Sequence, residues 1–296
     1  MEHIPVLLKE VLEYLKPSPG QRIIDATFNG GGHSSVILER IKPNGKVLGI
    51  ELDTELFSKA KERFSKVKEI ILINDNYRNL KKIAGENDFL KADGILFDLG
   101  LSSWHLSESK RGFSFQKEEP LDMRYWQKEE LTAREIVNQW PPEAIEKVLK
   151  EYGEEKFAKP ISKAIIEARK KKSVISTFQL IEVIKNAVPF WYRHGRRLHF
   201  ATKTFQALRI AVNDELGNLE SAVKELPNVL KSGGRALMIS FHSLEDRIIK
   251  NGFRSLKELG VVEIITKKPV RPSVEEVIKN PRSRSAKLRV IEISKK

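Results

Sequence analysis

The sequence predicts an α/β fold, a mostly parallel sheet with helices on both faces and an all-helical insertion. Short apolar runs, typical of buried strands, alternate with helical patterns as far as Gly100. No strong strand pattern occurs between Ser102 and Asn213, and strand patterns then resume at Arg235. We therefore expect one seven-stranded sheet that is formed by the two ends of the chain, with helices between them.

Four strands are expected in the first hundred residues, because apolar runs there are short and bounded by Gly, Asp or Asn. They cover residues 22–24, 47–50, 69–75 and 93–100. Apolar residues at helical spacing predict the helices between the strands. These cover residues 5–15, 34–41, 54–67 and 79–84.

The middle of the chain shows helix signals instead. Residues 101–125 resemble a loop, and capping-box patterns then begin at Thr132 and Ser176, while Pro141-Pro142 starts another helix. One long helix over residues 202–226 would return the chain to the sheet. The last strands are expected at residues 235–241, 261–266 and 288–293. The predicted domains are 1–104 with 211–296, and an inserted 105–210.

Composition excludes several classes of protein. The chain has 296 residues, 40% hydrophobic and 31% charged, and no cysteine. Such a chain forms a sizeable core, and it has neither thiolate catalysis nor cysteine-based metal sites. The histidines show no metal-binding spacing, so no metal is expected. Without an apolar membrane span or a signal peptide, we expect a cytoplasmic protein that uses no membrane.

Positive charge is concentrated in two segments. Residues 160–210 hold eleven Lys or Arg and two acids, and residues 267–289 hold eight and two, in a chain of net charge +13. A polyanion such as nucleic acid is the simplest partner for such segments. A solvated lysine-rich surface is the alternative.

The segment from Asp25 to Ser34 contains three successive glycines between a predicted strand and a predicted helix. Glycines there let the backbone approach a ligand, and the N–H groups at a helix start attract anionic groups. Glu51 ends the second strand, where an acid can accept hydrogen bonds from ribose hydroxyls. Together these features predict a nucleoside-cofactor site.

Three cofactor classes can be compared with this segment. A dinucleotide dehydrogenase would need a third glycine where Ser35 stands, and no P-loop motif occurs in the chain. The order of glycine loop, acid and a later strand ending in Asp98 is closer to an S-adenosylmethionine methyltransferase. Even there, Thr27 and Asn29 replace two of the usual glycines.

Each candidate residue has a functional and a structural interpretation. Gly31, Gly32 and His33 would meet the methionine end of the cofactor, and Tyr77 could lie against adenine. Asp98 would face the ligand, since ligands bind at the carboxyl ends of parallel strands. The structural alternatives are a surface acid for Glu51, a core aromatic for Tyr77, a polar helix-start residue for His33 and a turn cap for Asp98.

The chain also resembles the RsmH/MraW family of bacterial 16S ribosomal RNA cytosine N4-methyltransferases. Matching motifs occur along nearly its whole length. They begin at His3, Asp25, Asp93, Arg111, Pro120, Tyr152, Thr204, Ile239 and Asn280.

The resemblance implies a class I methyltransferase sheet with a helical insertion, and a decoding-centre cytosine in the small ribosomal subunit as the target. The oligomeric state is left open, a homodimer included. The implied contacts to S-adenosylmethionine come from Gly31, Gly32, His33, Glu51, Tyr77, Asp98 and His105. Glu51 and His105 stand where the family often has Asp and Gln, but both keep hydrogen-bonding capacity.

We expect Asp98 to be catalytic, accepting the hydrogens of the target amine together with the Leu99 carbonyl. Trp104, Phe113 or Phe115 could stack on the extruded base, or they could pack structurally. Phosphate contacts are expected from Arg193, Arg196, Arg197, Arg282 and Arg284. The alternatives are a DNA amino-methyltransferase, a non-enzymatic RNA-binding or assembly protein, and a dehydrogenase.

Overall fold

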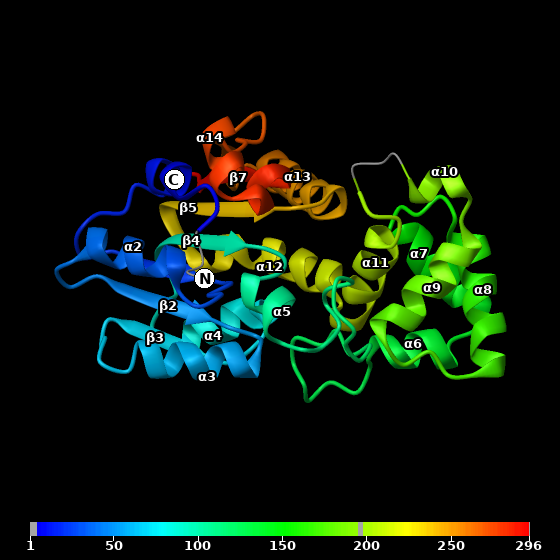
Figure 1. Cartoon of the computed structure of the whole chain (residues 1–296). Coiled ribbons are helices and arrows are strands. Elements are labelled where there is room, and N and C mark those ends of the chain that lie inside the picture. Colours follow the sequence, from blue (N-terminus) through cyan, green and yellow to red (C-terminus); the bar gives the residue numbers. More distant parts are fainter. Residues whose placement is uncertain (1–4, 195–197, 296) are drawn as a thin grey trace. The chain divides into compact units, whose positions relative to one another are not determined.

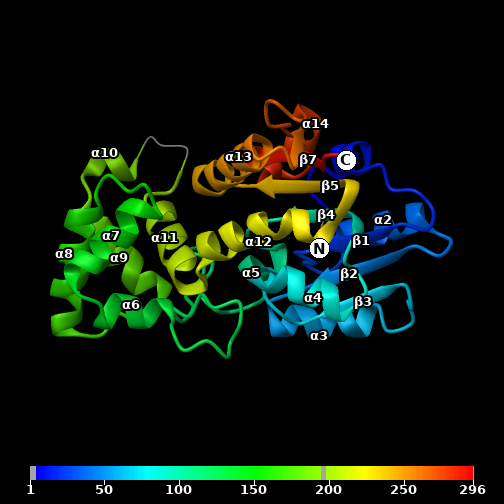
Figure 2. The same ribbon diagram turned by 180° about the vertical axis from the view of Figure 1, so that it is seen from behind.

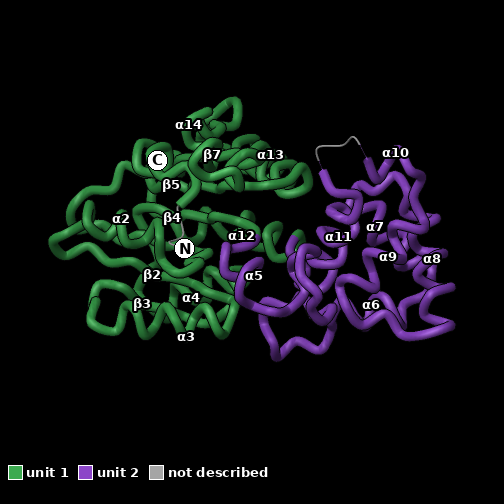
Figure 3. Tube along the Cα trace, viewed as in Figure 1, with its two compact units in different colours: residues 1–100, 216–296 green, residues 101–215 purple. Residues whose placement is uncertain are grey.

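The structure is a computed structural model that describes residues 5–194 and 198–295 (Figure 1). The predicted motif residue His3 and the predicted phosphate contacts Arg196 and Arg197 lie outside the described residues. The chain forms two compact units (Figure 3). Unit 1 comprises residues 1–100 and 216–296, and unit 2 comprises residues 101–215. The predicted boundaries, after residues 104 and 210, lie within a few residues of these.

Unit 1 is built on a seven-stranded sheet of order β3-β2-β1-β4-β5-β7-β6, so the predicted seven strands are confirmed. The strands are β1 Arg22–Asp25, β2 Lys46–Ile50, β3 Ile70–Ile73, β4 Ala92–Asp98, β5 Leu230–Ser240, β6 Val262–Ile264 and β7 Lys287–Ile293. The strands β1 to β5 are parallel, and β7 runs antiparallel to β5 and β6. The carboxyl ends of the five parallel strands therefore share one edge of the sheet.

Each face of the sheet is covered by its own helices (Figures 1 and 2). Neighbouring strand residues alternate between the faces, so that Ile23 and Leu96 enter one core while Ile24 and Ile95 enter the other. One face packs against α1 Leu8–Leu15, α2 Gly32–Ile41 and α3 Thr54–Arg63; the other against α4 Leu80–Glu86, α12 Glu215–Val229 and α13 Ser243–Glu258. The remaining elements are α14 Val274–Lys279 and the 3₁₀ turns η1 Tyr77–Asn79 and η2 Pro281–Ser285. This covering fixes the strand ends on which the candidate site lies.

The strand β5 begins earlier than predicted. The predicted turn around Gly233 lies inside the strand, where Gly233 has φ +75° and the pairing with β4 shifts between Ala92 and Gly94. The glycines that predicted a turn therefore lie in an irregular part of β5.

The prediction of one long helix over residues 202–226 is wrong. The chain forms α11 Thr202–Asn213 and then α12, with a break at Asp214, whose φ is +46°. Aspartate tolerates this left-handed conformation better than most residues. The Asn213 amide also binds a loop of unit 2, donating to the Met123 carbonyl and accepting from the Tyr125 N–H, both at 2.8 Å. A helix periodicity cannot reveal such a break, since both halves have the same period.

Unit 2 is helical (Figure 3). Its helices enclose a separate apolar core. They are α5 Ser103–Ser107, α6 Ala133–Gln139, α7 Pro142–Glu151, α8 Ala158–Lys171, α9 Thr177–Ala187, α10 Phe190–Arg193 and α11. The capping box at Thr132 and the helix start at Pro142 are confirmed. Ser176 caps α9, but the Gln179 side chain accepts from Ile175 instead of returning to Ser176. In the described part of the chain, every helix is too short or too polar to cross a membrane.

Candidate active site

The glycine loop joins β1 to α2 and leaves the start of α2 open. Asn29, Gly30 and Gly31 all have positive φ, at +47°, +86° and +81°. Gly31 is the N-cap of α2. Among the described residues no side chain caps this end, and the first turn has no acid. The N–H groups of the first helical turn therefore face outward from the helix end, as an anionic ligand group requires.

Gly31 has no room for a side chain. A Cβ atom there would lie 2.6 Å from Phe28 and 2.7 Å from Phe64, whose rings pack edge to face at 5.4 Å. Gly30 has a similar φ, but no atom of residues 5–194 and 198–295 lies within 4 Å of a Cβ placed there. The two neighbouring glycines are thus required for different reasons, Gly31 for space and φ and Gly30 for φ alone.

Glu51 follows β2 and is buried, with 5% of its surface exposed, so it is not a surface acid. One carboxylate oxygen accepts from the Asn29 N–H and the other from the Asp53 N–H, both at 2.9 Å. Burial raises its pKa to about 8, and the charge of Asp53 adds to the rise. When it is ionised, each oxygen can accept a second hydrogen bond, so the carboxylate form can receive a ribose hydroxyl.

Asp98 ends β4 and is buried, with 5% exposure. Burial raises its pKa well above the usual value, and the nearby carboxylates of Asp25, Glu245 and Glu276 add to the rise. Its Oδ1 atom is buried and has no hydrogen-bond partner among the described residues. Because buried carboxylate oxygens are normally paired, such an atom indicates a place where a ligand donor binds.

His33, in the first turn of α2, links Asp98 to the start of the chain. Its Nε2 lies 2.9 Å from the Val6 carbonyl oxygen, and its Nδ1 lies 3.7 Å from Asp98 Oδ2. A carbonyl can only accept, so Nε2 carries a hydrogen atom. The ring therefore presents Nδ1 toward the carboxylate of Asp98.

Two residues that the sequence analysis did not select hold these acids in place. The Thr27 hydroxyl accepts from the Asp98 N–H at 2.6 Å, and the Asn29 side chain donates to the Asp98 carbonyl at 3.1 Å. Asn29 thus connects Glu51 and Asp98 through its backbone and side chain. The sequence signal was present, since an Asn before glycines often adopts positive φ.

Asp25, at the end of β1, is the third buried acid of the site. The Ser34 hydroxyl donates to its Oδ2 at 2.6 Å. Burial nevertheless raises its pKa to about 7. Asp25, Glu51 and Asp98 thus form a buried cluster at one sheet edge, and a cation would stabilise its charged form.

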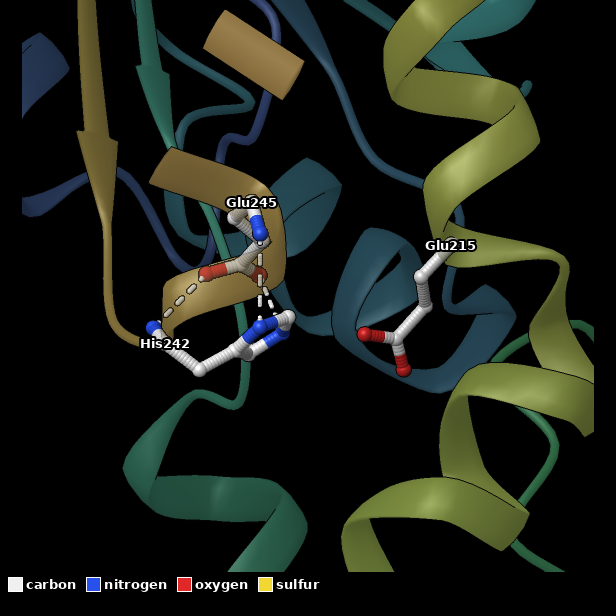
Figure 4. Close-up of side chains that lie close together, drawn as sticks. All are labelled: Glu215, His242 and Glu245. Atoms are coloured by element: carbon white, nitrogen blue, oxygen red, sulfur yellow. Dashed lines mark hydrogen bonds and ion pairs between the residues drawn. The ribbon is translucent and has the colours of Figure 1, made fainter. Parts of the chain in front are cut away.

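Glu245, in the first turn of α13, is a fourth buried acid near the site (Figure 4). Glu245 accepts from the backbone N–H groups of Phe241 at 2.8 Å and His242 at 3.2 Å, and the His242 ring caps the helix. Glu215, also labelled in Figure 4, belongs to unit 2, where Arg209 binds both of its carboxylate oxygens. Glu245 therefore orders the chain that leaves β5 and contributes negative charge near Asp98.

Tyr77 lies in η1, just after β3, and is partly buried. Its ring packs edge to face against Phe97 at 5.6 Å. This contact with Phe97 agrees with the structural interpretation of Tyr77, a core aromatic. Its partial exposure leaves the adenine contact open.

His105 belongs to unit 2 and is described there. It lies in α5, and the Ser102 hydroxyl is 2.8 Å from its Nδ1 in a capping box. Phe113, a predicted base-stacking residue, is 5% exposed and stacks on Tyr125 at 5.3 Å. Phe115 stacks on His199 at 4.7 Å. This packing favours the structural interpretation of both phenylalanines.

The raised pKa of Glu51 has a consequence for stability. Between the ordinary value of 4.5 and about 8, the folded protein keeps a proton that the unfolded chain has released. The free energy of unfolding should therefore fall as pH rises, by about 2 kcal/mol between about pH 6 and about pH 8. In denaturant titrations of the cofactor-free protein, Glu51→Gln should reduce this slope and leave the parts that come from Asp25 and Asp98, whereas Glu62→Gln, at an exposed position of α3, should leave it unchanged. Equal slopes in all three proteins would contradict the assignment.

The sheet order and the site together define the class of protein. An open sheet of this order with an antiparallel β7, a glycine loop after β1 and acids after β1, β2 and β4 is the arrangement of class I methyltransferases. The model of the MraW methylase family matches residues 1–294, and the chain belongs to this family. The predicted cofactor agrees with this membership, since the family depends on S-adenosylmethionine.

Curated relatives match along nearly their whole length. A "Ribosomal RNA small subunit methyltransferase H" of Persephonella marina is 47% identical over 291 residues, covering 98% of each chain. A protein of the same name from Dictyoglomus thermophilum is 47% identical, covering 97% of this chain and 95% of its own. Among solved structures, a putative rRNA methylase from Clostridium thermocellum gives a TM-score of 0.46 at 9% identity, covering 98% and 94% of the two chains.

Proposed function

We propose that the chain transfers a methyl group from S-adenosylmethionine to 16S ribosomal RNA of the small ribosomal subunit, in the cytoplasm. The proposed target is the exocyclic N4 amine of a decoding-centre cytosine. The observation that supports this most is the buried Asp98 at the end of β4, with one oxygen unpaired among the described residues. The names of the curated relatives support the RNA target.

The residues of unit 1 fit the cofactor chemically. The open start of α2 suits the methionine carboxylate, and Gly31, Gly32 and His33 would meet this end. Glu51 would accept from the ribose, and Tyr77 would lie against adenine. The buried acids suit the positive charges of the cofactor. His105 stays a prediction from the family resemblance.

The difficulty of the reaction lies in the amine. Its lone pair is delocalised into the cytosine ring, so it is a poor nucleophile. When bound, S-adenosylmethionine supplies an electrophilic methyl sulfonium. Asp98 would accept a hydrogen bond from the amine N–H and hold the nitrogen in line for attack, which localises the lone pair. After the methyl group has been transferred, the amine releases one proton.

The protonation state of Asp98 decides whether its side chain can accept a hydrogen bond from the target amine. Its raised pKa favours the protonated form in the cofactor-free protein. A positive charge nearby lowers the pKa of a carboxyl group, so binding of the cationic cofactor favours the accepting form. The Leu99 carbonyl would be the second acceptor, on a backbone fixed by the bond from the Leu99 N–H to Ile239 at 3.1 Å.

RNA binding is assigned to the two basic segments, residues 160–210 and 267–289. Arg193, Arg282 and Arg284 are the described candidates for phosphate contacts. Because such contacts release counterions, affinity should fall steeply with salt. The inserted helical unit is the proposed RNA-recognition domain.

The test is methyl transfer to small ribosomal subunits from cells that lack the enzyme. The purified protein and labelled S-adenosylmethionine should modify these subunits, and mass spectrometry of the RNA should show one N4-methylated cytosine. Subunits from cells that contain the enzyme are the control and should take up little label. Transfer to duplex DNA would favour a DNA amino-methyltransferase. RNA binding without cofactor binding in calorimetry would favour a non-enzymatic assembly protein.

A further inference from the structure

Two consecutive residues of unit 2 have large aromatic side chains that are exposed to solvent. Phe190 is 68% exposed and Trp191 is 63% exposed, both in α10. Large aromatic residues normally bury their rings, so adjacent exposed rings on an ordered helix indicate a contact surface. Figure 1 shows α10 at one end of the helical unit, above α7 and α9.

The helix α10 is held firmly, although its first two residues are exposed. Tyr192, the third residue, is buried, and its hydroxyl donates to both oxygens of the buried Glu155 at 2.7 and 2.8 Å. Glu155 also accepts from the Phe157 N–H at 2.9 Å. The Phe157 ring in turn contacts Tyr192 at 4.7 Å and Trp191 at 5.7 Å. The exposed rings are therefore pre-positioned, which limits the entropy that a ligand must overcome.

The surroundings of these rings are basic. The Arg193 guanidinium lies 5.6 Å from the centre of the Phe190 ring. The exposed Lys156 and Lys159 flank Phe157 in sequence, and the half-buried Lys203 donates to the Glu154 carbonyl. From residue 156 to residue 203 the sequence has twelve Lys or Arg and two acids. An apolar protein partner does not need this charge, whereas a phosphate backbone does.

We infer that Phe190 and Trp191 form a stacking platform for unpaired bases of the substrate RNA, with Arg193 and the neighbouring lysines holding its backbone. This rests on the proposed function and adds a subsite to it. Single-stranded nucleic acids are bound in this way elsewhere, by aromatic faces combined with a positive surface. Every base has such a face, so the platform would favour unpaired RNA over duplex and would read little sequence.

The test uses the full chain and a single-stranded RNA oligonucleotide of mixed sequence, with binding followed by fluorescence anisotropy. Loss of one stacked base costs about 1–3 kcal/mol, so Phe190→Ala or Trp191→Ala should raise the Kd about 5- to 150-fold. The matched control is Phe178→Ala, since Phe178 is 43% exposed on α9 of the same unit and lies in a groove that also contains acids. Its Kd should stay within about twofold of the original protein.

Two further substitutions separate stacking from apolar docking and from misfolding. Trp191→Phe keeps an aromatic face and should retain most of the affinity. Trp191→Leu keeps an apolar side chain without that face, so it should bind as poorly as Trp191→Ala. An unchanged Kd for both alanine variants would overturn the inference. So would an equal loss in Phe178→Ala, or a loss of duplex binding as large as that of single-stranded binding.

The platform and the proposed function can fail separately. Cofactor binding by calorimetry and methyl transfer by the unaltered protein test the function alone. The anisotropy assay tests the platform without any catalytic turnover. If affinity for RNA is kept and only binding of a small-subunit protein is lost, the surface takes a protein partner and the inference is wrong.

Discussion

Replacing Asp98 by asparagine is expected to lower kcat for methyl transfer about 10²- to 10⁴-fold, the range of a positioned acid–base group. The amide has the same size but only one oxygen that can accept, and its NH₂ group would oppose the hydrogens of the target amine. The backbone contacts at Asp98, from its N–H to Thr27 and from Asn29 to its carbonyl, do not involve the side chain. The fold and the cofactor site should therefore survive.

The control lies on the same strand. Asp93 is near the opposite end of β4, where it accepts from the Arg22 N–H and pairs with Lys231. Asp93→Asn should leave kcat within about twofold, apart from a small loss of stability. Single-turnover kinetics would measure the chemical step, and calorimetry the Kd of S-adenosylmethionine. Full turnover in Asp98→Asn with unchanged cofactor binding would remove the catalytic role.

Much of unit 1 could be predicted because the patterns that specify its strands and its site each lie within a short stretch of sequence. Strand periodicity, the glycine triplet and an acid at the end of a strand are each visible within a few residues, and a parallel sheet places all such strand ends at one edge. Asp25, Glu51 and Asp98 therefore meet, although 73 residues separate the first from the last. The burial of Glu51 follows from the same rule, because the residue just after a central strand is enclosed by its neighbours.

The details that the sequence did not give depend on contacts between distant segments. The bond between His33 and the Val6 carbonyl needs the N-terminal segment to lie beside α2. The break at Asp214 needs a loop of unit 2 to bind the Asn213 amide. The packing of Phe113 depends on Tyr125, twelve residues later in the chain, whose ring stacks on it. The periodicity of a sequence reports only local structure, so it cannot predict such pairings between distant segments.

The glycine loop is expected to be sensitive to a single added methyl group. Gly31→Ala should lower the free energy of unfolding by roughly 2–5 kcal/mol, because a left-handed φ and an overpacked core add together. The new Cβ would overlap the rings of Phe28 and Phe64. These rings would have to move, and the start of α2 would move with them. S-adenosylmethionine should then bind at least about tenfold more weakly, since small displacements of a preformed site are costly.

Gly30→Ala separates the two causes. Its φ of +86° resembles the +81° of Gly31, but a Cβ there would meet no atom within 4 Å in the described part of the chain. We expect a loss of about 1–2 kcal/mol from the backbone alone. Denaturant titration of the two variants, with calorimetry of cofactor binding, gives the difference that is due to packing. Equal losses would mean that the Phe28–Phe64 pair yields easily, and that the glycine loop is selected for its backbone conformation only.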